Sequence, residues 1–299
     1  MESVQRTKLS AGRPSATPFV LAFAVIVMAA VALATMPVYA GADPAYLTVL
    51  TPVFQWVPFL AIVVLHAVHR SRVTQAPGDA AREAPWRLWV ASGVTLRGRS
   101  SSIIVMSLVA LIALVITAVV PLVASGAAGM IDLRWAEGAA MAAFLTLPVA
   151  VVFMVPVAGE ELAWRGYLTS LLSRHGFAAT TALIGGLWAL WHLPLLAALA
   201  HVGELDGRDV VSKTIDLLLA AVLVSALRYL SGSVWPAVFA HALFNNLFQM
   251  VQYNFMEPLS AATTSGYWGY MAVSWVTWLI VDAVLVVWVY RATGGRLDR

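Results

Sequence analysis

Two adjacent carboxylates and an arginine interrupt an apolar stretch of the chain, in GEELAWRGYL at residues 159–168. If this stretch is helical, Glu161 and Arg165 stand at i and i+4 on one face and can form an ion pair. Glu160 is turned by about 100° from its neighbour and is left without that partner. An unpaired carboxylate in a medium of low dielectric suits a general base. The alternative is a buried ionic cluster that only fixes helix packing.

Two imidazoles and a carboxamide follow at helical spacing. In GLWALWHLPL, Trp188 and His192 are four residues apart, and in VWPAVFAHALFNNLF the same spacing separates His241 from Asn245. Each pair therefore shares a helix face. A single histidine among tryptophans is commonly a packing residue, so His192 needs a partner to count as a site residue.

A hairpin supplies that partner. Glu160 lies sixteen residues before Gly176, and His192 lies sixteen residues after it. An antiparallel helical hairpin closing at Gly176 would set both side chains at the same height. For His241 to be level with them, the hairpin must project about 14 Å into the cytosol, because His241 lies only about 10 Å below the cytoplasmic end of its helix.

This set of groups predicts hydrolysis of a peptide bond. Glu160 would take a proton from water, His192 would orient that water, and His241 with Asn245 would donate to the developing oxyanion. Alternatively, one carboxylate and two imidazoles, from Glu160, His192 and His241, could hold zinc and leave a fourth position for water. Both interpretations stay open.

The elements that must position these groups are membrane helices. Hydrophobic residues make up 61% of the 299 and charged residues 11%, against about 25% charged in soluble domains. The apolar residues form runs near the ~20 needed to cross a bilayer. The predicted spans are 18–40, 47–68, 102–124, 138–160, 177–200, 213–230, 234–251 and 267–290. The first run exceeds the apolar core of a signal peptide, ~7–15 residues, and is predicted to be retained.

Charge placement predicts that both termini are cytoplasmic, since short cytoplasmic loops collect Lys and Arg. With that orientation, the loops on the non-cytoplasmic side hold only three basic residues, Arg134, Arg208 and Lys213. The cytoplasmic set is Arg6, Lys8, Arg13, Arg70, Arg72, Arg82, Arg87, Arg97, Arg99, Arg174, Arg291, Arg296 and Arg299. This asymmetry explains the net charge of +3 without a nucleic-acid partner. The absence of cysteine excludes disulfides and thiolate sites.

We divide the chain into five segments. Residues 1–17 form a disordered basic N-terminus, 18–68 a two-helix appendage, 69–101 a cytoplasmic loop, 102–291 a six-helix catalytic core, and 292–299 a basic tail. His66, near a cytoplasmic helix end of the appendage, is expected to be solvated. Asp282 lies in mid-span with no partner near it in sequence.

The three motifs resemble those of the CPBP family of intramembrane proteases, which includes CAAX prenyl endopeptidases and bacterial proteins linked to bacteriocin processing and self-immunity. The family pattern is E-E-x-x-x-R, then F-x-x-x-H, then H-x-x-x-N or H-x-x-x-D. Trp188 stands here where phenylalanine is usual, which should affect pocket shape and substrate and leave the polar groups untouched.

The resemblance implies Glu160 as general base, Glu161 and Arg165 as its supports, and His192, His241 and Asn245 as the rest of the site. Both a metallo and a metal-free glutamate mechanism have been argued for the family, so zinc stays open.

We therefore predict an all-α, polytopic intramembrane endopeptidase of about eight spans that acts on a membrane-associated polypeptide. Two lysines among 18 basic residues fit a GC-rich bacterial genome and hence a bacterial plasma membrane. The alternatives are a non-catalytic membrane immunity or partner-binding protein, and a small-solute or proton-coupled transporter in which Asp282 would matter as much as Glu160.

Overall fold

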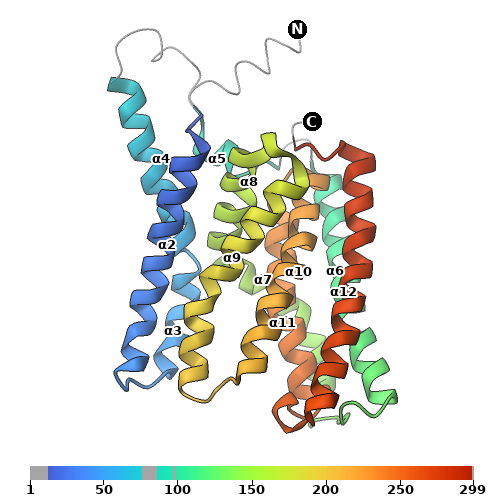
Figure 1. The fold of residues 1–299 in the computed structure, drawn as a ribbon. Coiled ribbons are helices and arrows are strands. Elements are labelled where there is room, and N and C mark those ends of the chain that lie inside the picture. Colours follow the sequence, from blue (N-terminus) through green and yellow to red (C-terminus); the bar gives the residue numbers. More distant parts are fainter. Residues whose placement is uncertain (1–12, 76–85, 97–98, 298–299) are drawn as a thin grey trace.

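The computed structural model describes residues 13–75, 86–96 and 99–297. Long helices run side by side in one bundle, and α2 begins at the end of the bundle where α12 finishes (Figure 1). The elements are α2 (Ala16–Tyr39), α3 (Ala45–Phe54), α4 (Val57–Gln75), α5 (Leu88–Ala91), α6 (Ser100–Ala127), α7 (Ala139–Glu161), the π-helix η2 (Leu162–Leu168), α8 (Thr169–Leu172), η3 (Ser173–His175), α9 (Gly176–His201), α10 (Gly207–Ser231), α11 (Trp235–Phe255), η4 (Leu259–Ala261) and α12 (Thr264–Thr293). The described residues contain no strand beyond one isolated bridge, so the all-α class is confirmed.

The predicted spans all coincide with helices. The second is divided, because α3 ends at Phe54 and α4 begins at Val57. Six helical stretches of the described chain are long and apolar enough to cross a membrane. One of them, Ala139–His201, holds both legs of the α7–α9 hairpin, and α11 is not among the six. The polytopic class is therefore confirmed, whereas the count of eight spans stays a prediction.

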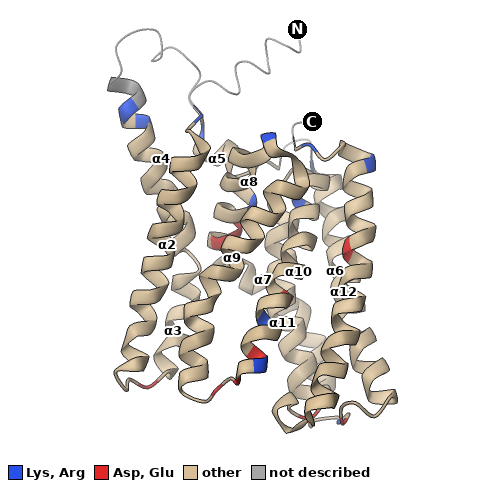
Figure 2. Cartoon of the chain, viewed as in Figure 1, with Lys and Arg blue, Asp and Glu red and all other residues tan. Residues whose placement is uncertain are grey.

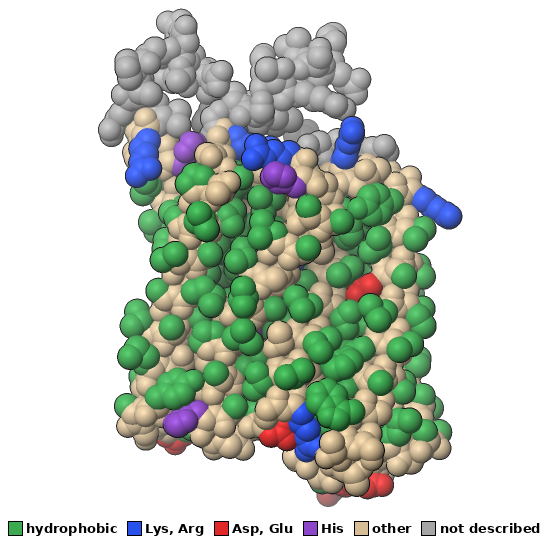
Figure 3. All heavy atoms as spheres, in the orientation of Figure 1, with side chains coloured by type: hydrophobic (Ala, Val, Ile, Leu, Met, Phe, Trp, Pro, Cys, Tyr) green, Lys and Arg blue, Asp and Glu red, His purple; other side chains and the backbone are tan. Residues whose placement is uncertain are grey.

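The surface of the bundle agrees with a lipid environment. Hydrophobic side chains cover its sides, and the charged side chains gather mainly at the two ends (Figure 3). Phe144 and Val152 on α7 are 74% and 68% exposed, which is costly in water and favourable in hydrocarbon.

The two ends differ in charge. Lys and Arg mark the end where α2 begins, and most Asp and Glu lie in the loops at the opposite end (Figure 2). This pattern is consistent with the predicted orientation, which stays a prediction. Arg6, Lys8, Arg82, Arg97 and Arg299 lie outside the described residues, as do parts of the predicted segments 1–17, 69–101 and 292–299.

The hairpin turns as predicted but does not project. Gly176, with a φ of +77°, follows the short η3 and lets the chain reverse into α9, since a left-handed conformation favours glycine. The turn lies about level with the neighbouring end of α12 (Figure 1). The predicted projection of about 14 Å is therefore wrong.

His241 reaches its depth because the start of α11 is recessed. Ser233 and Val234, in the turn between α10 and α11, are 0% exposed. They are covered by the segment 86–96, which we call the cap. Val234 N donates to Gly93 O at 3.0 Å, and Trp235 Nε1 donates to Val94 O at 3.1 Å. A part of the predicted cytoplasmic loop is therefore packed structure.

The cap lies directly against η2 through Gly166. A Cβ atom at this position would stand 2.5 Å from the carbonyl oxygen of Ser92. Gly166→Ala should push the cap away and lower the free energy of unfolding by about 1–3 kcal/mol, the usual range for overpacking. Gly186→Ala on α9 is the matched control, since nothing lies within 4 Å of its Cβ. Thermal unfolding in detergent would compare the two, and equal midpoints would contradict the close contact.

The two N-terminal helices pack on η2 as well. Phe23 of α2 meets Trp164 edge to face at 4.9 Å, and Phe19 stacks on Tyr167 at 5.3 Å. His66 of α4 is 5% exposed, and its Nδ1 lies 3.0 Å from the Tyr167 hydroxyl. The expectation of a solvated His66 is therefore wrong. The division into appendage and core stays a prediction, although both parts share one hydrophobic core.

Candidate active site

Glu161 and Arg165 form the ion pair that their spacing predicts. Arg165 Nη1 donates to Glu161 Oε1 at 2.9 Å, and both side chains are 0% exposed. The same oxygen accepts a second bond of 2.9 Å from Nδ1 of His241, because a carboxylate oxygen only accepts. One atom thus links α7, η2 and α11. Such hydrogen bonds offset part of the cost of burying the charges.

Glu160 has a partner that sequence reasoning missed. Its Oε2 accepts a hydrogen bond of 2.8 Å from the indole nitrogen of Trp188 on α9. The prediction that Trp188 leaves the polar groups untouched is therefore wrong. Glu160 forms no ion pair with Arg165, and its Oε1 has no hydrogen bond to any described residue. The carboxylate is thus held at one oxygen and free at the other.

Trp188, one turn before His192, is the residue that lies opposite Glu160. The prediction that Glu160 and His192 lie at the same height assumed that both helices of the hairpin are α-helical throughout. Leu162–Leu168 is instead a π-helix. A π-helix closes its hydrogen bonds over five residues, so it advances less per residue than an α-helix. The leg that carries Glu160 also contains the 3-10 helix η3, so it is not a uniform α-helix and the predicted equal height of Glu160 and His192 does not hold. No local feature of LAWRGYL predicts this.

His192 remains beside the cluster in a defined tautomer. Its Nδ1 lies 2.8 Å from the carbonyl oxygen of Trp188, and a carbonyl only accepts, so Nδ1 carries the hydrogen. Nε2 is then the nitrogen left for a water molecule. Asn245 is half-buried and forms no hydrogen bond with the described residues.

α10 supports the π-helix through a side chain that the motifs do not include. Arg228 Nε donates to the carbonyl oxygen of Arg165 at 3.0 Å, and its Nη2 donates to Ser170 Oγ at 3.4 Å. Arg228 is only 4% exposed. The sequence places Arg228 inside a predicted span, and the motifs gave it no role.

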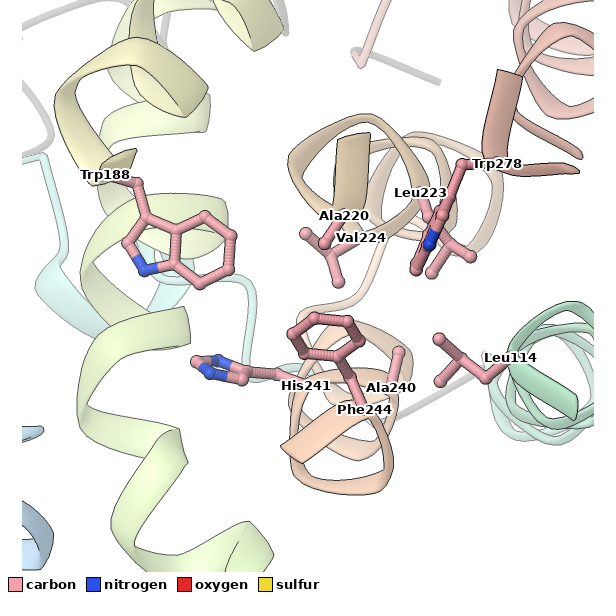
Figure 4. Close-up of a pocket in the computed structure, with 9 residues that line it drawn as sticks. All are labelled: Leu114, Trp188, Ala220, Leu223, Val224, Ala240, His241, Phe244 and Trp278. Carbon is pink, nitrogen blue, oxygen red and sulfur yellow. The ribbon is translucent and has the colours of Figure 1, made fainter. Parts of the chain in front are cut away.

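A small cavity adjoins His241. Figure 4 shows Trp188 and His241 near one another, on α9 and α11, with Phe244 beside His241 and Trp278 on the opposite side. The cavity measures about 10 Å³, enough for about one water molecule. Its remaining walls are aliphatic side chains of α6, α10 and α11.

The zinc site that the sequence leaves open as an alternative gains no support from the arrangement. Among the described residues, no three His, Asp or Glu side chains converge as a ligand set. We therefore derive no step through a metal ion.

Asp282 lies outside this network. It is 5% exposed, and neither of its carboxylate oxygens has a hydrogen-bond partner in the described part of the chain. It forms no hydrogen bond to the described site residues and is therefore not part of the network around Glu160.

The family match to known proteins falls in the region of the chain that holds the candidate site. Residues 141–248, which contain the six predicted site residues, match the family described as Type II CAAX prenyl endopeptidase Rce1-like. A stretch of 51 residues is 41% identical to the CAAX prenyl protease 2 of Methanococcus maripaludis, and it covers 17% of this chain. The chain thus spans only 19% of the length of that curated relative. The motifs and this match agree, and residues 141–248 are similar to the CPBP family of membrane proteases.

Proposed function

We propose that this protein is an intramembrane endopeptidase in which Glu160 activates water for attack on a peptide bond. The observation that carries the proposal is the state of Glu160. It is 1% exposed, bonded at Oε2 to a neutral donor, and without an ion pair to Arg165. Such a carboxylate can still take a proton from water. Glu161, in contrast, already accepts hydrogen bonds from Arg165 and His241.

The proposed reaction uses Glu160 twice. Oε1 accepts a proton from water while the water oxygen attacks the peptide carbonyl carbon, which gives a tetrahedral oxyanion and a protonated Glu160. The C–N bond then breaks, and the same proton passes to the leaving nitrogen. The products are a carboxylic acid and an amine, and Glu160 returns as carboxylate.

The remaining groups position the reactants. His192, with its Nδ1 hydrogen held by a carbonyl, would accept a hydrogen bond from the attacking water at Nε2. His241 would donate from Nε2 to the oxyanion in its doubly protonated form, whose charge Glu161 compensates at Nδ1. Asn245, one turn beyond His241 on α11, would supply a second donor. Arg165 and Glu161 act as supports of this geometry.

The substrate class follows from the surroundings. A multi-pass helical protein with its reactive groups below the surface of the bundle is suited to a polypeptide that is itself held at the membrane. The bilayer is the other partner, and no surface of the kind that binds nucleic acid is expected. A bacterial plasma membrane is the location that we propose.

The test is a comparison of membrane peptides in host cells that express wild-type protein or Glu160→Gln at equal levels. New peptide termini are expected only with the wild-type protein, and mass spectrometry would identify them. Identical sets of termini in the two samples would contradict the proposal.

A further inference from the structure

Trp188 lies beside four site residues, which belong to the four elements α7, η2, α9 and α11. Its indole N–H donates to Glu160 at 2.8 Å, and the guanidinium carbon of Arg165 lies 4.1 Å above its ring. The rings of His192 and His241 each lie 5.3 Å from it, at 88° and 81°. The side chain is 1% exposed. Trp188 therefore makes polar and aromatic contacts with the site residues in addition to packing in the apolar core.

The two parts of the indole do different things. The N–H group can only donate, so it stabilises Glu160 as an acceptor and fixes the direction of Oε2. The ring face attracts the Arg165 guanidinium through a cation–π contact, worth about 2 kcal/mol or more when desolvated. Arg165 is thereby held on Glu161, and no ion pair reaches Glu160 among the described residues.

Phenylalanine can supply only half of this arrangement. Its ring would still offer a face to Arg165, but it has no N–H for Glu160. The carboxylate of Glu160 would then lose the one hydrogen bond that the described structure gives it. Its rotamer would be free, and Oε1 would no longer have one orientation toward water.

We propose that Trp188 is a positioning residue, which orients Glu160 through its indole N–H and keeps Arg165 away through its ring face. This inference rests on the proposed function, because it assigns Trp188 a role in the water activation by Glu160.

Two matched substitutions on α9 test the role in turnover. Trp188→Phe should lower kcat by about tenfold to a hundredfold, the usual worth of a hydrogen bond to a charged group, with little change in KM. Trp191→Phe makes the same change three residues away. Trp191 is 5% exposed, and its indole nitrogen has no partner among the described residues. Trp191→Phe should therefore keep nearly the wild-type kcat, and equal losses in both variants would overturn the inference.

A spectroscopic readout separates positioning from general damage to the fold. The indole N–H resonance of Trp188 in isotope-labelled protein is assigned by its disappearance in Trp188→Phe. Glu160→Ala removes the acceptor, so this resonance should shift while that of Trp191 stays in place. A Trp188 resonance that does not move would overturn the inference.

The two hypotheses fail separately. If wild-type protein shows no cleavage that depends on Glu160, the proposed function is wrong, and the resonance still decides whether Trp188 holds Glu160. If cleavage depends on Glu160 but Trp188→Phe behaves as Trp191→Phe does, the proposed function stands and the role of Trp188 is wrong.

Discussion

A Glu160→Gln variant should lose cleavage activity by a factor of about 10² to 10⁴, the usual contribution of a general base. Glutamine has the same shape, and its carbonyl oxygen can still accept the hydrogen bond from Trp188. It cannot take a proton from water. We therefore expect nearly unchanged thermal unfolding together with a large fall in kcat, measured on a substrate peptide identified from the membrane fraction.

Asp282→Asn is the control for this experiment. It also replaces a buried carboxyl group in the same bundle by an amide, but Asp282 has no hydrogen bond to the described site residues. Its activity should equal that of the wild-type protein. Retained cleavage in Glu160→Gln would contradict the assigned base. Protection of a host by Glu160→Gln as strong as by the wild-type protein would favour a non-catalytic partner-binding role, and loss of solute uptake in Asp282→Asn would favour a transporter.

An Arg165→Met variant should be the most destabilised of the set, by about 3–5 kcal/mol. Removing one member of a buried ion pair leaves the other charge uncompensated. Here Glu161 is 0% exposed, and one of its oxygens, Oε2, already lacks a partner in the described residues. The cation–π contact with Trp188 is lost as well. Thermal and denaturant unfolding in detergent would measure the loss, and cleavage should disappear with it.

Two further variants give this prediction its controls. Glu161→Gln combined with Arg165→Met removes the uncompensated charge and should recover part of the lost stability, because the glutamine oxygen can still accept from His241. Arg174→Met, on the exposed turn of the same hairpin, should change stability by no more than about 0.5 kcal/mol. An Arg165→Met protein as stable as Arg174→Met would contradict the structural role of the pair.

The features that could be predicted from the sequence are local in the chain. Apolar runs locate the helices because each run must cover a hydrocarbon layer of fixed thickness. Glu161 and Arg165 pair because four residues bring side chains onto one helix face. The same rule separates Glu160 from Arg165. These relations need only the geometry of one α-helix.

The features that could not be predicted depend on contacts between distant segments. The Trp188 bond to Glu160 lies in a hairpin whose first leg contains the π-helix η2 and the 3-10 helix η3, which a uniform α-helical count ignores. The recessed start of α11 requires the cap, whose backbone hydrogen bonds with residues more than a hundred positions away leave no pattern in the sequence. His66 is buried because Tyr167 offers it a hydroxyl. Its position near a helix end predicted that the side chain would be exposed to solvent.

The cavity beside His241, about 10 Å³ in volume, has a consequence for how the protein could be regulated. A peptide advances about 3.3 to 3.6 Å per residue and is far larger than one water molecule. If a peptide is hydrolysed at Glu160 as proposed, this cavity is too small to admit it, and we expect α9, α10 and α11 to separate before the peptide binds. Such helix motions take microseconds to milliseconds. The lateral pressure of the lipid around the bundle would then act on the entry of substrate, and a KM that is equal in fluid and stiff vesicles would argue against such an opening.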